Sequence, residues 1–372
     1  MRNQPDFADD ILALFAQRGA RPVDIPVIQP ADAFLDMAGE ELRRRIFLTE
    51  SETGESLCLR PEFTIPVCLH HIATAPTDKR RYAYLGQVFR QRRDGDNEFY
   101  QAGIEDLGTV DMAAADAAAM KDASNTLAAL LPGRALQTTL GDQTVFEAVV
   151  AALGLPEGWQ TRLVRAFGDP VLLNSLLSDL SRPKGDGPGV DAEAQGLLAA
   201  GNETGLAAVI DARMRATGYL TNSSRTPTEI AQRMIQKSHV ASAHLDDRSL
   251  GVLRSFLALD TPLAEAPSAL ARFAAEADID IAVALSGFDG RVKALQGLGF
   301  DATDSRYRAA FGRPLDYYTG LVFEMAAEGA VLAGGGRYDR LLTLLGAQTP
   351  IPAVGFSLWL DRIAATRDGG AD

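Results

Sequence analysis

The sequence predicts an α+β protein in which a helical insertion divides a mixed core into two parts. Residues 82–90 and 99–107 alternate with a period of two around the polar insert 94–97, which predicts a hairpin of two antiparallel strands. Helix and strand patterns both occur before residue 154 and after residue 248, whereas residues 155–247 show helical patterns. We expect a discontinuous core at 1–154 and 248–366, a helical insertion at 155–247 and a disordered tail at 367–372.

The first part of the core begins with a helix. Phe7, Ile11, Leu14 and Phe15 recur at helical spacing, acidic residues occupy the early turns, and Gly19 is expected near the end. An extended segment follows at residues 22–28. The further expected elements are strands at 46–48 and 57–60, a helix at 64–71, the hairpin, a helix at 112–131, a strand at 136–140 and a helix at 143–154.

The insertion and the second part of the core also show patterns of helices, strands and loops. The Pro- and Gly-rich stretch at residues 182–189 predicts a loop within the insertion. The expected elements after it are helices at 249–257, 263–275 and 287–298, strands at 307–311, 320–326 and 331–333, a helix at 338–345, a strand at 353–357 and a last helix.

Composition excludes several classes of protein. The 372 residues carry 36 Lys and Arg against 49 Asp and Glu, a net charge of −13, whereas a dedicated nucleic-acid binder needs a basic surface. The apolar runs fall short of the ~18 residues that a membrane span needs, and the N-terminus lacks the apolar core of a signal peptide, so we expect a cytoplasmic protein. Cys58 and Cys68 are expected to be small buried residues, and the four histidines do not form a metal-ligand cluster.

Residues 60–64 place a carboxylate and a hydroxyl where a strand meets a helix. Glu62 and Thr64 can hold an ammonium group there, or they can simply cap the first turn of the helix.

The second hairpin strand presents Gln101, Gly103 and Glu105 on one face, because side chains alternate along a strand. A glycine between two polar side chains leaves room for a ligand. The alternative is a polar face exposed to solvent.

Residues 312–320 bring Arg313, Tyr317 and Tyr318 into a short segment that leads into a strand. Three glycines, Gly334 to Gly336, are expected to follow another strand, where they allow close backbone approach to a small ligand or simply form a turn. They fit neither a P-loop nor the dinucleotide-binding fingerprint.

The order of these segments resembles the catalytic core of class II aminoacyl-tRNA synthetases, and histidyl-tRNA synthetase most closely, over most of residues 5–365. The resemblance is most specific at residues 315–324 and 333–339, with support from 59–64 and 101–105. Pro26 matches the interface proline of motif 1, residues 88–90 match motif 2, and residues 352–362 match motif 3. The resemblance implies a mainly antiparallel sheet flanked by helices, and a homodimer.

The resemblance also implies roles for single residues. Glu62, Thr64, Gln101 and Glu105 correspond to the residues that hold the ammonium and imidazole groups of histidine. Tyr317 and Tyr318 would wall this histidine-binding pocket. Arg313 corresponds to the arginine that serves the carboxylate and the activation step, and Arg90 corresponds to the motif 2 arginine that holds the α-phosphate of ATP.

The sequence departs from the synthetases where ATP binds. Motif 2 of the synthetases has Arg-x-Glu, whereas this chain has Arg90-Gln91-Arg92 and a shortened, acidic loop. Reversed charges near a triphosphate lower its affinity. Trp359 replaces a glycine of motif 3, and its indole is expected to fill the purine's space unless it points into the core. We also expect no anticodon-binding domain after motif 3.

A synthetase core with these changes resembles the regulatory subunits of ATP phosphoribosyltransferase, which are non-catalytic paralogues of histidyl-tRNA synthetase. The resemblance implies a short-form catalytic subunit as partner, a homodimer within a hetero-octamer, free histidine as effector, no cofactor, and no binding to nucleic acid or membrane. Two alternatives remain: a truncated synthetase-like enzyme that activates histidine, favoured by Arg90, Arg313 and Arg362, and a histidine-sensing module for another partner.

Overall fold

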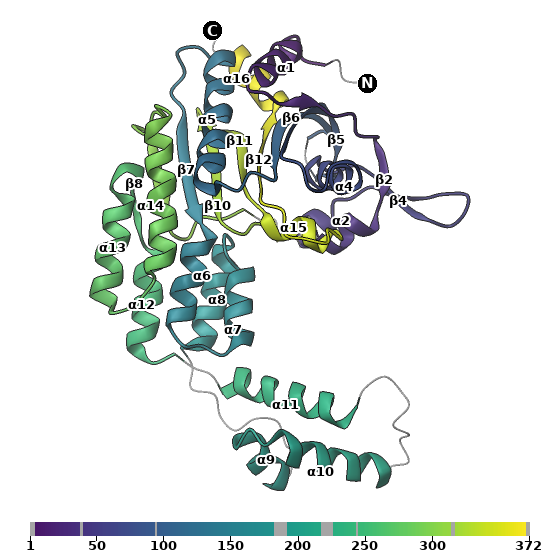
Figure 1. Cartoon of the computed structure of the whole chain (residues 1–372), viewed down its shortest axis with the longest axis vertical. Coiled ribbons are helices and arrows are strands. Elements are labelled where there is room, and N and C mark those ends of the chain that lie inside the picture. Colours follow the sequence, from purple (N-terminus) through teal and green to yellow (C-terminus); the bar gives the residue numbers. More distant parts are fainter. Residues whose placement is uncertain are drawn as a thin grey trace. The chain divides into compact units, whose positions relative to one another are not determined.

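The computed structural model describes residues 4–37, 40–93, 95–181, 192–216, 226–242, 245–313 and 317–369. These residues fall into two compact units, drawn in Figure 1. The first, the core unit, takes residues 1–148, 167–169 and 256–372, and the second, the helical unit, takes residues 149–166 and 170–255. The expected loop at 182–189, Asp94 of the hairpin insert, Leu315 and Asp316, and residues 370–372 lie outside the described residues.

The core unit is built on a nine-stranded sheet with the order β1-β5-β6-β12-β11-β10-β7-β9-β8. Among the described strands, β1–β5 and β7–β9 pair in parallel and the other neighbours are antiparallel. The bounds are β1 Arg21–Pro22, β5 Arg80–Phe89, β6 Glu98–Leu107, β7 Gln137–Asp142, β8 Asp260–Pro262, β9 Ser305–Arg308, β10 Leu321–Ala327, β11 Ala330–Arg337 and β12 Ala353–Trp359. The mainly antiparallel sheet of the sequence prediction is confirmed.

The hairpin β5–β6 is confirmed over its whole length, with Arg80 opposite Leu107 and Phe89 opposite Glu98. The short strand β8 was not predicted from the sequence. Its three residues, one of them a proline, are too few to show a periodic pattern.

A second, three-stranded sheet has the order β2 (Ile28–Pro30), β4 (Ser56–Leu59) and β3 (Leu48–Glu50). The strand was expected at 46–48, and the observed strand β3 begins two residues later, at Leu48. The reason is that Arg45 and Ile46 bond to the hairpin end instead: the Gln91 N–H donates to the Arg45 carbonyl at 2.8 Å, and the Gln91 side chain donates to the Ile46 carbonyl at 3.3 Å.

Helices of the core unit pack around the sheet. The Ala-rich helix α5 lies beside α14 (Figure 1), and small buried residues such as Ala115, Ala119 and Ala123 let α5 approach its neighbours closely. The bounds are α1 Ala8–Gln17, α2 Asp32–Met37, α3 Glu40–Arg43, α4 Thr64–Thr74, α5 Met112–Leu130, η1 Leu263–Glu265, α13 Ala266–Ala277, α14 Ala282–Gly297, α15 Asp339–Leu344 and α16 Leu360–Asp368. The disordered tail was expected to begin at residue 367. Helix α16 continues to Asp368, so Arg367 and Asp368 are helical instead.

An ion network is buried between the sheet and these helices. Arg291 of α14 binds Asp116 of α5 (Nε to Oδ2, 2.6 Å) and Asp142 at the end of β7. Arg337 of β11 binds the other oxygen of Asp116 at 2.6 Å and also Asp339 at 2.7 Å. The side chains of Arg291 and Arg337 are at most 9% exposed, so their charges depend on these partners. The network ties α5, α14, β7 and β11 together.

The helical unit contains α7 (Glu157–Arg165), α8 (Pro170–Leu180), α9 (Ala192–Ala199), α10 (Glu203–Ala216) and α11 (Pro227–Ser242). Leu198, Leu206 and Ala231 form a small hydrophobic cluster between α9, α10 and α11. Helices α6 (Gln143–Ala152) and α12 (Asp247–Leu257) run from one unit into the other. Among the described helices of the chain, none is long and apolar enough to cross a membrane.

Candidate functional site

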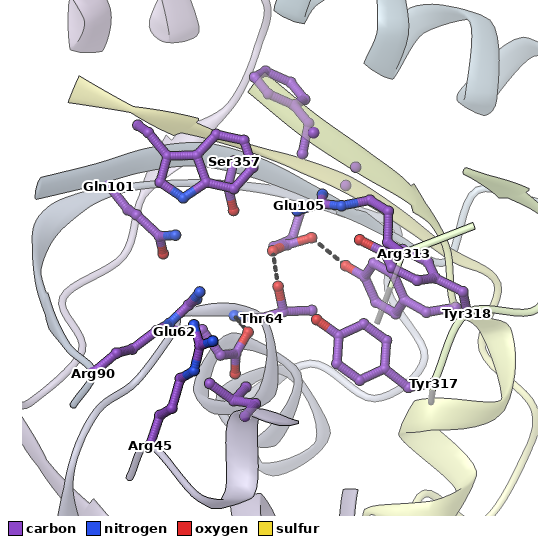
Figure 2. Close-up of a pocket in the computed structure, with 17 residues that line it drawn as sticks. Arg45, Glu62, Thr64, Arg90, Gln101, Glu105, Arg313, Tyr317, Tyr318 and Ser357 are labelled. Carbon is purple, nitrogen blue, oxygen red and sulfur yellow. Dashed lines mark hydrogen bonds between the residues drawn. The ribbon is translucent and has the colours of Figure 1, made fainter. Parts of the chain in front are cut away.

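The eight residues that the sequence predicts to bind histidine line one pocket of the core unit, with a volume of about 110 Å³. This is room for a few water molecules or for one small organic ligand. Figure 2 shows Glu105 at its centre, with Glu62 and Arg90 on one side and Arg313 and the two tyrosines on the other. The eight are Glu62, Thr64, Arg90, Gln101, Glu105, Arg313, Tyr317 and Tyr318. Their role as ligand-binding residues remains a prediction.

The start of α4 supplies one wall of the pocket. The Glu62 carboxylate accepts hydrogen bonds from the backbone N–H groups of Thr64 (2.7 Å) and Ile65 (2.9 Å), so the capping alternative describes part of its role. Burial raises the pKa of Glu62, while these hydrogen bonds and the charge of Arg90 act in the opposite direction. Glu62 therefore both fixes the helix start and lines the pocket.

The strand β6 places Glu105 in the pocket floor. Its carboxylate accepts hydrogen bonds from Thr64 Oγ1 at 2.7 Å and from Tyr338 Oη, the two dashed lines at Glu105 in Figure 2. Burial raises the pKa of Glu105 from 4.5 to about 8, and nearby Glu62 acts in the same direction. Because Gln101 and Glu105 are only 2% and 1% exposed, the alternative of a solvated strand face is wrong.

The pocket also contains cationic and neutral polar groups. Arg90 donates from Nε to the Pro61 carbonyl at 2.7 Å, and its burial lowers its pKa to about 10. Arg313 pairs with Glu324 at 3.2 Å. The buried Oε1 of Gln101 has no hydrogen-bond partner within the described part of the chain. Carboxylates and guanidinium groups in one small pocket suit a ligand that carries both charge signs.

Trp359 lies against this site, since its side chain lines the pocket at 7% exposure. Its ring centroid is 5.2 Å from Cζ of Arg313 and 4.9 Å from Cζ of Arg362. The alternative in which Trp359 points away into the core is therefore wrong. Arg362 itself is exposed and donates to the Val331 carbonyl at 2.8 Å, outside the residues that line the pocket.

The three glycines were expected to follow a strand. They lie instead within β11, which runs to Arg337. A Cβ atom on Gly334 would lie 2.3 Å from a guanidinium nitrogen of Arg313, and one on Gly336 would lie 2.8 Å from the Tyr318 ring. The turn is therefore wrong: Gly334 and Gly336 leave room for side chains that line the pocket, and Gly335 lies against the backbone of β12. Because Gly334 and Gly335 themselves line the pocket, close approach to a small ligand stays a prediction.

Several residues that line the pocket were not singled out from the sequence, among them Tyr338, Ser357 and Arg45. Tyr338 bonds Glu105, Ser357 shares a 2.6 Å hydrogen bond with Tyr84 Oη, and Arg45 lines the pocket opposite the sheet. Tyr338 stands directly after the glycines and could have been found there. Arg45 is one of three consecutive arginines, and nothing in the sequence distinguishes it from the others.

No cluster of metal ligands occurs among the described residues. His71 is buried with its Nδ1 3.1 Å from Tyr82 Oη. Cys58 and Cys68 are buried and unbonded, as the sequence predicts.

The stability of the unliganded protein is expected to fall as the pH rises from about 5 to about 8. Glu105 has a pKa of about 8 in the folded protein against 4.5 ordinarily, so between these values the folded state holds a proton that the unfolded chain has released. This stabilisation is complete below the unfolded pKa and is lost as the pH passes the folded pKa, at up to about 1.4 kcal/mol per pH unit.

Urea denaturation across this pH range measures the effect. Glu105→Gln should flatten the decline, whereas Glu276→Gln, at an exposed position on α13, should keep the wild-type profile. A decline that is unchanged in Glu105→Gln would assign the pH dependence to other groups.

Comparison with known proteins gives a consistent result. The family model described as histidyl-tRNA synthetase matches residues 1–171 and 223–363. The ATP phosphoribosyltransferase regulatory subunit of Allorhizobium ampelinum (strain ATCC BAA-846 / DSM 112012 / S4) is 62% identical over 367 residues, which are 98% of each chain. The protein of the same name from Rhizobium meliloti (strain 1021) is 63% identical over 97% of this chain and 96% of its own.

Solved structures share the fold. A protein from Bacillus halodurans C described as an ATP phosphoribosyltransferase regulatory subunit/histidyl-tRNA synthetase aligns with a TM-score of 0.65 at 20% identity, over 98% of this chain and 81% of that one. Histidyl-tRNA synthetase from Nostoc sp. PCC 7120 aligns with a TM-score of 0.63 at 16% identity, over 97% and 71%. At these identities the likeness concerns the fold.

Proposed function

The chain belongs to the family of ATP phosphoribosyltransferase regulatory subunits, which carries the histidyl-tRNA synthetase fold, and from this premise we propose that it makes a short-form catalytic subunit responsive to free histidine. The family places it in histidine biosynthesis with a non-catalytic role beside a catalytic partner. We propose three further points: feedback by histidine, a short-form catalytic partner, and assembly into a hetero-octamer.

The pocket around Glu105 is the observation that carries the proposal. Arg313 is suited to the ligand carboxylate, and Glu62 with the unpartnered Oε1 of Gln101 is suited to the ammonium group. The imidazole N–H can donate to Glu105, which already accepts bonds from Thr64 and Tyr338. The carboxylate, the ammonium group and the imidazole N–H of histidine then each meet a complementary group.

Two departures from the synthetases favour regulation over histidine activation. Arg92 stands where the synthetases have a carboxylate, and Cζ of Arg92 lies 4.1 Å from the Phe99 ring centroid. Trp359, which replaces a glycine of the synthetase motif 3, lines the pocket, which supports the expectation that its indole occupies the space of the purine. Arg90 and Arg313 in the pocket favour the alternative of a truncated synthetase-like enzyme, so nucleotide chemistry has to be tested directly.

Histidine can act as an effector if the two assembly states bind it with unequal affinity. A coupling of about 1 to 3 kcal/mol is ordinary for such linkage and would shift the active population 5- to 150-fold. We place the chain in the cytoplasm as a homodimer, within a hetero-octamer of four copies of each subunit. The exposed apolar residues Ile28 and Leu48 of the small sheet, near Pro26, support a dimer contact there.

The proposal is tested by mixing the purified chain with a short-form catalytic subunit. We expect a stable complex in size-exclusion chromatography with light scattering, a higher rate of phosphoribosyl transfer to ATP, and inhibition by free histidine. No complex and no change in rate or histidine sensitivity would contradict the proposal. Histidine-dependent exchange of pyrophosphate into ATP by the isolated chain would instead support the synthetase-like alternative.

A further inference from the structure

The chain returns to the core unit once within the helical insertion. Residues 149–166 belong to the helical unit, 167–169 to the core unit, and 170–255 to the helical unit again. This return segment, Phe167 to Asp169, connects the end of α7 at Arg165 to the start of α8 at Pro170.

The return segment is packed tightly against the residue that precedes Arg313. A Cβ atom on Gly168 would lie 2.5 Å from the carbonyl carbon of Gly312 and 3.0 Å from the Arg313 nitrogen. In the reverse direction, a Cβ atom on Gly312 would lie 2.8 Å from Cα of Gly168 and 2.9 Å from the ring of Phe167. The two backbones therefore touch, with no room for one methyl group between them.

Other contacts hold both sides of this junction. The ring of Phe167 stacks on Phe146 of α6 at a centroid distance of 5.0 Å. A Cβ atom on Gly141 of β7 would lie 1.8 Å from the Phe311 carbonyl oxygen, so residues 311–312 are confined between β7 and the return segment. Gly168 has a φ of +85°, a conformation that other residues rarely adopt.

From this packing we propose that the return segment is a positioning element for Arg313 that sets the affinity of the pocket for a carboxylate ligand. The Arg313 guanidinium pairs with Glu324 and lies over Gly334, where a larger residue would displace it. The Arg313 backbone nitrogen packs against Gly168. Helices α7 and α8 are joined covalently to the two ends of the segment. The inference rests on the proposed function only for the identity of the ligand.

The test is the reactivity of Arg313 with phenylglyoxal, measured by peptide mass spectrometry on the full chain. Arg313 is only 12% exposed and should react slowly in the wild type. Gly312→Ala should raise its reactivity several-fold while that of Arg90 stays the same. Gly287→Ala on α14, where the added methyl meets nothing within 4 Å, is the matched control and should leave both unchanged.

Calorimetry with histidine and with histamine, which lacks the carboxylate, provides the second arm. Gly312→Ala should weaken histidine binding roughly ten-fold and leave histamine binding unchanged. In an Arg313→Met background it should have no further effect. If Gly312→Ala does not fold, Phe167→Leu, which alters the ring beside Gly312, should change both readouts in the same direction.

The outcomes separate the two proposals. Unchanged Arg313 reactivity in a folded variant would overturn the positioning role, whatever the pocket binds. Increased reactivity in a protein that binds no histidine would support the positioning role and contradict the proposed function.

Discussion

Glu105→Ala is expected to weaken histidine binding by roughly 30- to 1,000-fold in calorimetry at pH 7, a loss of about 2 to 4 kcal/mol. The substitution removes the acceptor for the ligand imidazole and leaves the buried hydroxyls of Thr64 and Tyr338 without their present partner. Glu98→Ala, on the same strand and outside the residues that line the pocket, should bind as the wild type does. Equal affinities of Glu105→Ala and wild type would remove Glu105 from the binding site.

A single methyl group on the neighbouring strand should have a similar effect. Gly355 of β12 lies directly opposite Glu105, and a Cβ atom there would lie 1.6 Å from Oε2 of Glu105 and 2.8 Å from the Ile104 carbonyl. Gly355→Ala must therefore displace the carboxylate, although every polar side chain of the pocket is still present. Gly287→Ala again serves as the matched control.

Arg291→Met is expected to destabilise the protein by about 3 to 5 kcal/mol. The guanidinium binds Asp116 and Asp142, which are 0% and 1% exposed, and methionine would leave Asp142 without its cation. Asp116 keeps Arg337, so the effect should be centred on β7 and α14. The change in free energy of unfolding follows from the midpoint of urea denaturation.

Lys293→Met is the matched control, because Lys293 lies two residues further along α14 and pairs with Asp289 at 71% exposure. Removing such a surface pair should change stability by less than about 0.5 kcal/mol. Similar losses in the two variants would mean that the buried network contributes no more than a surface pair.

Local pattern predicted the elements whose own residues carry a signal. The hairpin β5–β6 was found from its period-two alternation around a polar insert, although β6 is buried along most of its length, and helix α5 was found from its Ala-rich run. Gly334 to Gly336 were expected after a strand because glycine is typical of turns, yet here the side chains of Arg313 and Tyr318 occupy the space beside them. Such contacts come from distant parts of the chain, so local pattern could not show them.

The pocket residues were found through order and resemblance, whereas the buried ion network around Asp116 was not. Glu62 and Glu105 stood out as carboxylates at the end and on one face of strands. Asp116 did not, since it lies within an Ala-rich helix and finds Arg291 and Arg337 only in the folded chain, 175 and 221 residues away. Sequence separation of this size hides an ion pair from any local reasoning.

The return segment has a consequence for engineering. A shortened protein that joins residue 148 directly to residue 256 would lose the whole helical unit and, with it, Phe167 and Gly168. The Phe146 ring would lose Phe167 as a stacking partner and keep Phe256, and the backbone at Gly312 would lose its contact with Gly168. The insertion therefore cannot be removed or transplanted by cutting at its two ends alone. A deletion that preserves the pocket also has to replace residues 167–169, which lie between the two parts of the insertion and belong to the core unit.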